Sequence, residues 1–110
     1  MGADVFISFY GIEFPVPDGE ALTEIEEQND VRVVRARQHR LDWWLGRLTD
    51  GAPFHLLVGK MIAQLGAEQS NGLDLTDADL SKLCEQTRQL LTDAGFQESP
   101  RLILKYESDY

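Results

Sequence analysis

The stretch LDWWLGRLTDGAPFHLLVGKMIAQL, residues 41–65, decides the fold class of this chain. Its first part places apolar residues at every second position, as a β-strand does, and Asp50-Gly51 between two apolar runs is a hairpin signal. The second run, from Phe54 to about Leu65, is apolar at both odd and even positions. We therefore predict an antiparallel hairpin whose second strand is central in a sheet.

The residues before the hairpin predict a strand followed by helical turns. Apolar residues alternate from Val5 onward and shift phase at Gly11, which indicates a β-bulge or a tight turn because glycine accepts positive φ. Pro15 cannot donate to a β-ladder, so it places the end of this strand at a sheet edge or in the following loop. A short acidic helix is predicted after a cap at Asp18. Residues 30–41 fit a helix, with a strand as the alternative because β-branched residues alternate there.

The residues after the hairpin predict a long helix and a last strand. Thr76 fits a helix N-cap, and apolar residues then recur at three- and four-residue intervals until Gly95, a typical helix stop. The expected buried stripe comprises Leu80, Leu83, Cys84, Thr87, Leu90, Leu91 and Ala94. Residues 101–106 alternate as a strand does. Its expected core-facing residues are Leu102, Leu104 and Tyr106, and its expected outward residues are Ile103, Lys105 and Glu107.

The order of these elements predicts a single α+β domain over residues 1–110. We expect a two-layer sandwich, in which about four mainly antiparallel strands form a sheet and two or three helices pack on it. A doubly wound nucleotide-binding fold is disfavoured, because regular βαβ alternation and a glycine-rich first turn are both missing.

Charge and composition narrow the class of protein. The 110 residues include 19 acids and 10 bases, for a net charge of -9, and one cysteine. Residues 1–30 carry -8, residues 31–60 carry +4 and the remainder -5. A single cysteine excludes an internal disulfide. No apolar run approaches the roughly 20 residues of a membrane span. The N-terminal residues lack the basic region that is typical of a signal peptide. We expect a cytoplasmic protein. The acidic segment 13–30 is either an interaction surface or a solvated face.

The tandem tryptophans and the arginines near them are the candidate interaction residues. Neighbours on a strand face opposite sides, so Trp43 and Trp44 cannot both fill one core, and one of them needs a cover. Tryptophan and arginine are enriched in interface hot spots. The predicted contact residues are Trp43, Trp44, Arg35, Arg37 and Arg47. They predict a small acidic module that binds a protein partner or forms a homodimer. Immunity proteins and phage accessory proteins are similar to this chain in size and charge, but no sequence motif is shared.

The alternative function is a small hydrolase-like enzyme. Its site would assemble from His39, Asp42, His55 and Glu68. Against it, no metal-ligand spacing, nucleophile elbow or phosphate-binding loop is present, so no catalytic residue, metal or cofactor is predicted. Nucleic acid is disfavoured as a partner because the rest of the molecule is acidic around one basic segment. We therefore expect an interaction module without catalytic activity and without a membrane partner.

Overall fold

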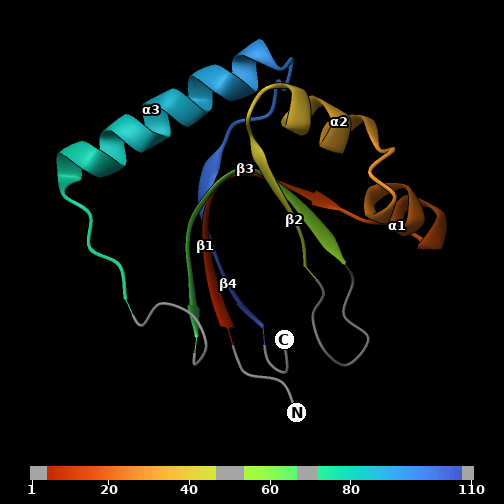
Figure 1. Cartoon of the computed structure of the whole chain (residues 1–110), viewed down its shortest axis with the longest axis horizontal. Helices are drawn as coiled ribbons and strands as arrows, with labels where there is room; N and C mark the ends of the chain where they lie inside the picture. The colour runs from red at the N-terminus through yellow and green to blue at the C-terminus, as the bar shows by residue number, and fades with distance from the viewer. Residues whose placement is uncertain (1–4, 47–53, 67–71, 108–110) are drawn as a thin grey trace.

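The structure is a computed structural model that describes residues 5–46, 54–66 and 72–107. In chain order its elements are β1 (Val5–Pro15), α1 (Gly19–Glu26), α2 (Val31–Gln38), β2 (Asp42–Gly46), β3 (His55–Gly66), α3 (Asp77–Asp93) and β4 (Arg101–Glu107) (Figure 1). The four strands form one antiparallel sheet in the order β2-β3-β1-β4. The α+β prediction, the antiparallel 41–65 pair and the central position of β3 are confirmed. The predicted Asp50-Gly51 turn lies outside the described residues.

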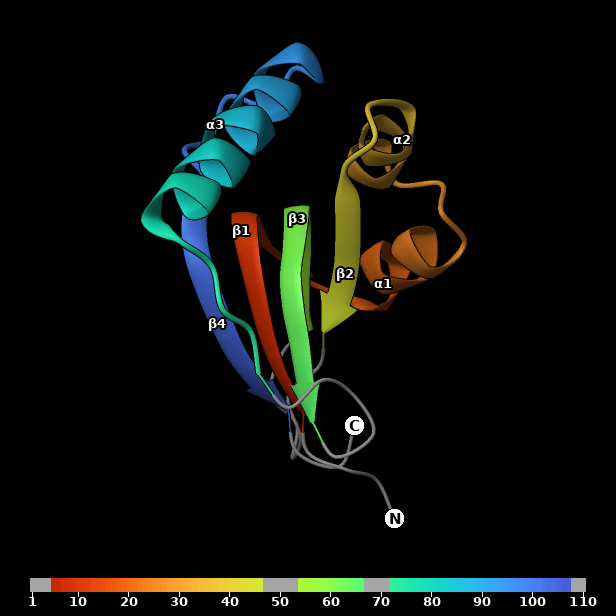
Figure 2. The same cartoon turned by 60° about the vertical axis from the view of Figure 1, so that its left-hand side comes forward.

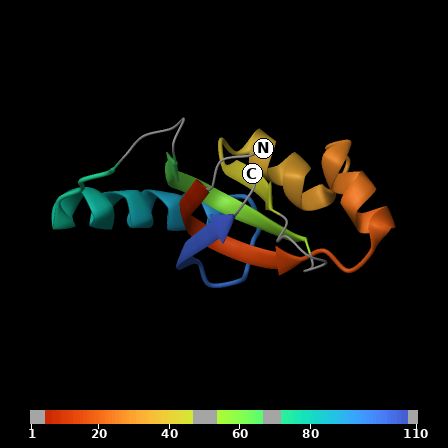
Figure 3. The ribbon, with the colours of Figure 1, turned by 90° about the horizontal axis from the view of Figure 1, so that it is seen from below.

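A pair of opposed glycines marks a bend in the sheet. Gly11 of β1 lies opposite Gly59 of β3, and Figures 1 and 3 show both strands turning near mid-length. A Cβ on Gly11 would overlap the carbonyl oxygen of Val58, and a Cβ on Gly59 would overlap that of Tyr10. Gly59 also has φ +156°, a conformation that L side chains rarely adopt. The two backbones approach this closely only because neither residue carries a side chain.

The bend turns the two arms of one sheet face toward each other. Lys105 of β4 lies beside Ile7, six residues from Glu13 along β1. Six residues of straight strand span about 20 Å, yet the Lys105 Nζ lies 2.9 Å from a Glu13 carboxylate oxygen. We call this concave side, which carries the odd-numbered residues of β1, the inner face. The even-numbered residues of β1 lie on the outer face.

Each face carries its own hydrophobic cluster. The inner cluster consists of Val5, Ile7, Phe9, Leu57 and Ile103, with Trp44 and Met61 packed against it. The outer cluster joins strand residues Ile12, Leu56 and Val58 to helix and loop residues Val16, Ile25, Val33, Ala36, Leu41, Leu91, Ala94 and Phe96. The helices therefore pack on the half of the outer face around Ile12 and Val58, and Figure 2 shows the three helices gathered beside the upper half of the sheet.

The helix ends follow the sequence signals. Asp18 and Thr76 cap α1 and α3, accepting from the amides of residues 21 and 79 at 2.8 and 3.0 Å. Residues 30–41 contain the helix α2 rather than a strand, and Asp30 is its N-cap. Gly95, at φ +90°, ends α3, and the Phe96 amide donates to the Leu91 carbonyl at 3.0 Å. That bond, with the one from the Gly95 amide to the Thr92 carbonyl at 3.0 Å, forms a Schellman motif at the predicted helix stop.

The predicted bulge at Gly11 is wrong in position. The β1–β3 register shifts between Ser8 and Phe9, and β1 continues through Gly11 to Pro15. Before Gly11 the buried apolar residues of β1 are odd-numbered and belong to the inner cluster, and after Gly11 they are even-numbered and belong to the outer cluster. The side chains of the strand still alternate between the two faces throughout. Pro15 ends β1 before a loop, as expected, although β1 lies inside the sheet.

The predicted orientation of β4 is also wrong. Ile103 is buried, whereas Leu102, Leu104 and Tyr106 are 55%, 71% and 46% exposed. The physical reason is that Ile103 pairs with the fully buried Phe9, so the inner cluster takes the odd-numbered residues of β4. The strand therefore turns its more apolar side outward.

The expected stripe of α3 is buried only near the C-terminal end of the helix. Thr87 and Leu91 are buried, Leu90 packs against the outer cluster, and Leu83 and Cys84 are half-buried. Figure 1 shows the reason, since the N-terminal half of α3 extends away from α1 and α2. Cys84 is therefore less protected than its place in the stripe predicts.

Candidate functional site

The tandem tryptophans lie on opposite faces, as their adjacency predicts. Trp43 packs against the outer cluster and Trp44 against the inner one. The Trp44 and His55 rings lie 5.9 Å apart, and a Cβ on Gly46 would overlap both side chains. The chain itself therefore packs against each indole. Both side chains remain half-buried, and their contact with a partner stays a prediction.

The arginines of α2 divide into one anchored and two exposed residues. Arg32 forms a bidentate ion pair with Asp30 at 2.8 and 2.9 Å and lies 4.9 Å over the Phe14 ring. The Arg32 guanidinium beside Asp30 lowers the pKa of that carboxyl. Arg35 and Arg37 are exposed, and Arg37 lines a shallow depression of about 320 Å³ with Val34 and Gln38. Arg47 lies outside the described residues.

The residues of the enzyme alternative do not converge where the structure describes them. Asp42 lies opposite Gly59 and His55 opposite Gly46, four residue pairs apart along the β2–β3 ladder. Asp42 accepts from the Met61 amide at 2.9 Å and lies 4.0 Å from the Lys60 ammonium. His39 is the half-buried C-cap of α2, and Glu68 falls outside the described residues. Within the described residues, no group of three or more His, Cys, Asp or Glu could hold a metal ion.

His55 has a structural environment that accounts for its titration. The side chain is buried on the inner face beside the Trp44 ring. Burial lowers the pKa of His55, Lys105 lowers it further, and Glu13 opposes them. Burial and Lys105 therefore favour neutral imidazole inside the fold, and Glu13, which favours the charged form, is paired with Lys105.

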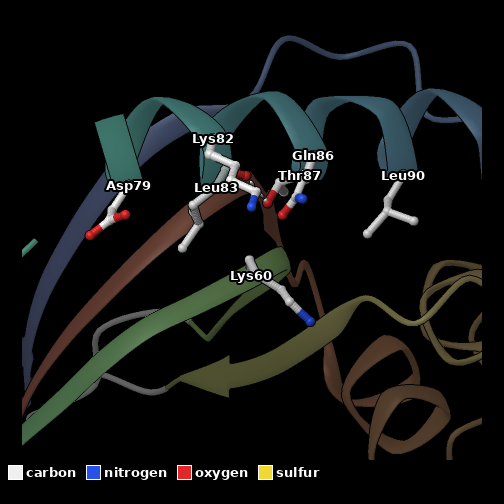
Figure 4. A pocket seen from close by; sticks show the side chains of 7 residues that line it. All are labelled: Lys60, Asp79, Lys82, Leu83, Gln86, Thr87 and Leu90. Carbon is white, nitrogen blue, oxygen red and sulfur yellow. Dashed lines mark hydrogen bonds between the residues drawn. The ribbon is translucent and has the colours of Figure 1, made fainter. Parts of the chain in front are cut away.

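A groove of about 210 Å³ lies under α3. It is lined by Lys60, Asp79, Lys82, Leu83, Gln86, Thr87 and Leu90 (Figure 4). Leu83 and Leu90 point from the helix toward the strands. The Thr87 hydroxyl donates to the Leu83 carbonyl at 2.7 Å, and the Lys60 ammonium donates to the Arg40 carbonyl at 3.4 Å. The groove is thus lined by apolar residues of α3 and by the charged residues Lys60, Asp79 and Lys82.

The uncovered half of the outer face carries several exposed large apolar side chains. Phe6 of β1 is 54% exposed, and the β1–β4 register places it opposite Tyr106, with Ser8 opposite Leu104. The Phe6 and Tyr106 ring centroids lie 4.9 Å apart. We call Phe6, Leu102, Leu104 and Tyr106 the open apolar patch.

Uncharged residues adjoin this patch within the sheet except at its end toward α3, where Tyr10 lies opposite Lys60. Ser8 lies between Phe6 and Tyr10 on β1, and its β3 partner is Ala63, while Phe6 lies opposite Leu65. The Tyr10 hydroxyl at the end toward α3 accepts from Arg88 at 3.0 Å. Contiguous exposed apolar surface of this kind marks binding sites more often than scattered exposed residues do. The sequence contained the signal, the alternation over residues 101–106, but the same alternation describes a core-facing strand.

The candidate site is therefore the open apolar patch, whose exposed residues are apolar or aromatic. In the part of the chain that the structure describes, no helix has both the length and the apolar composition to cross a membrane. Comparison of the chain with protein-family models, with curated proteins and with solved structures found no match.

Proposed function

We propose that this protein is a cytoplasmic interaction module without catalytic activity, which binds a protein partner or a second copy of itself through the open apolar patch. One observation carries the proposal. Four large apolar side chains lie next to one another on one face of the sheet, and each is 46% to 71% exposed. Leaving such a surface in water is unfavourable, and a partner that covers it gains about 25 cal/mol for each Å² of apolar area buried.

The charge of the molecule supports a protein as the partner. The chain carries -9 overall, which disfavours a phosphate-bearing partner, and the cations beside the patch, Lys60 and Arg88, lie at Tyr10 at its end toward α3. Apolar and aromatic side chains at the centre of a surface, with charges kept outside it, are typical of protein interfaces. Arg35 and Arg37 on α2 are proposed as the alternative contact surface of the same module.

Quantitative affinity capture from the native host lysate tests the proposal. Leu104→Glu places a charge at the centre of the patch, and we expect it to abolish capture of the specific partner. The matched control is Val31→Glu, because Val31 is also a large exposed apolar residue, at 57%, but lies on α2. Circular dichroism checks that each variant is folded.

Three outcomes separate the alternatives. Loss of the partner with Leu104→Glu and its retention with Val31→Glu supports the patch. Equal capture by both variants, with loss in the double variant Arg35→Glu/Arg37→Glu, would assign binding to the arginines of α2 instead. A parent chain that captures no protein and sediments as a monomer would overturn the interaction module itself.

A further inference from the structure

The outer edge of β4 lacks several of the features that usually block strand addition. Among the described residues, no strand pairs with this edge, since β4 ends the strand order of the sheet. Natural edges are protected by short length, proline, bulges or free charges. β4 has seven residues, no proline and an unbroken register with β1. Its central charge, Lys105, is engaged by Glu13 at 2.9 Å on the inner face.

The opposite edge of the sheet is shorter and is more enclosed by its own chain. β2 has five residues and begins at Asp42, directly after α2 and the turn at His39 and Arg40. Its two indoles pack on clusters of the same chain. The edge suited to strand addition is therefore β4.

The sequence of β4 complements itself in one antiparallel register. A two-fold axis perpendicular to the sheet must place one residue opposite its own copy. When that residue is Leu104, Arg101 faces Glu107 of the second copy, and Leu102 faces Tyr106. Opposite charges then meet twice, and the two apolar patches join on the outer face.

The neighbouring symmetric registers are disfavoured by charge. A register centred on Ile103 places Arg101 opposite Lys105 of the second copy, twice over. A register centred on Lys105 places the two Lys105 residues opposite each other. Like charges directly opposite in a sheet destabilise the pairing.

We propose that two copies of the chain associate through antiparallel β4–β4 pairing centred on Leu104, which makes one continuous eight-stranded sheet. This inference rests on the proposed function and names a second copy as the occupant of the patch. The joined patches place Leu104 against Leu104 and Leu102 against Tyr106, so each copy shields part of the other's exposed apolar surface.

Charge reversal tests this register. Arg101→Glu alone, or Glu107→Arg alone, places like charges opposite each other at two symmetric positions, and we expect the dimer dissociation constant to rise by about tenfold or more. The double variant Arg101→Glu/Glu107→Arg restores both opposite-charge pairs and should return the dissociation constant to near the parent value. Sedimentation velocity over a concentration series at low ionic strength measures all four chains, because salt screens these pairs.

The reciprocal rescue is the decisive result. If both single reversals leave the dimer dissociation constant unchanged, β4–β4 pairing is overturned. It is also overturned if the double variant fails to restore the parent dissociation constant. Either result would indicate another contact, such as packing of the two patches face to face. A parent chain that remains monomeric at the highest concentration would overturn the second copy as occupant. In that case, capture of a partner that Leu104→Glu abolishes would leave the proposed function standing.

Discussion

The two halves of the outer sheet face contain the same kinds of residue and differ in what covers them. Around Ile12, Leu56 and Val58, the three helices pack on the strands, and these side chains are at most 5% exposed. Around Phe6 and Leu104, the same sheet has no helix from the described chain packed on its face, and exposure reaches 71%. The difference shows that the fold closes its core without using the second half. That half is then available for another molecule.

The largest expected effect comes from disturbing the bend between the two arms. We expect Gly59→Ala to reduce the free energy of unfolding by about 3 kcal/mol or more, because a Cβ there overlaps the Tyr10 carbonyl and φ +156° disfavours any L side chain. Urea denaturation measures the loss. The control is Gly19→Ala in the first turn of α1, where a Cβ meets nothing within 4 Å, and we expect almost no loss. Equal stability of the two variants would contradict the account of the bend.

A second pair of variants compares the covered and open halves directly. Leu91→Ala removes a side chain that is 2% exposed in the outer cluster and should cost about 2 to 5 kcal/mol. Leu104→Ala removes one that is 71% exposed and should cost less than about 0.5 kcal/mol. Chemical denaturation is measured at a concentration at which each chain is monomeric. Similar losses for both leucines would mean that the patch is part of the monomer's core.

The inner face supplies a smaller effect that depends on pH. Burial lowers the pKa of His55 in the folded chain, so the unfolded chain takes up a proton first, near its ordinary pKa of 6.5. Stability should therefore fall as the pH drops through about 6.5 and stop falling below the folded pKa. Denaturation between about pH 7.5 and pH 5 should show a weaker slope for His55→Gln than for the parent. An unchanged slope would exclude His55 as the group responsible.

Much of the fold was predictable because its signals are local. The caps at Asp18 and Thr76, the stop at Gly95 and the hairpin strands depend on residues close together in sequence, and the structure confirms them. At residues 30–41 local spacing favoured a helix but left a strand as the alternative, and the structure contains the helix α2 there.

The wrong predictions concern which face of a strand is buried by the rest of the chain. Alternation in β4 reveals two sides but not which side the inner cluster occupies, and that choice depends on Phe9, about 90 residues away in the chain. The bend has the same origin, since Gly11 acquires its role only opposite Gly59. The candidate site was missed for this reason, because an exposed apolar strand face and a buried one have the same sequence pattern.

The most direct test of the open apolar patch is side-chain footprinting with a photoactivated carbene. The chain is labelled once purified and dilute, and once in the assembly isolated from its native host. We predict that labelling of Phe6, Leu102 and Leu104 falls in the assembly, while labelling of Val31 on α2 stays the same. Unchanged labelling of the patch, together with protection around Val31 and Arg37, would contradict the account.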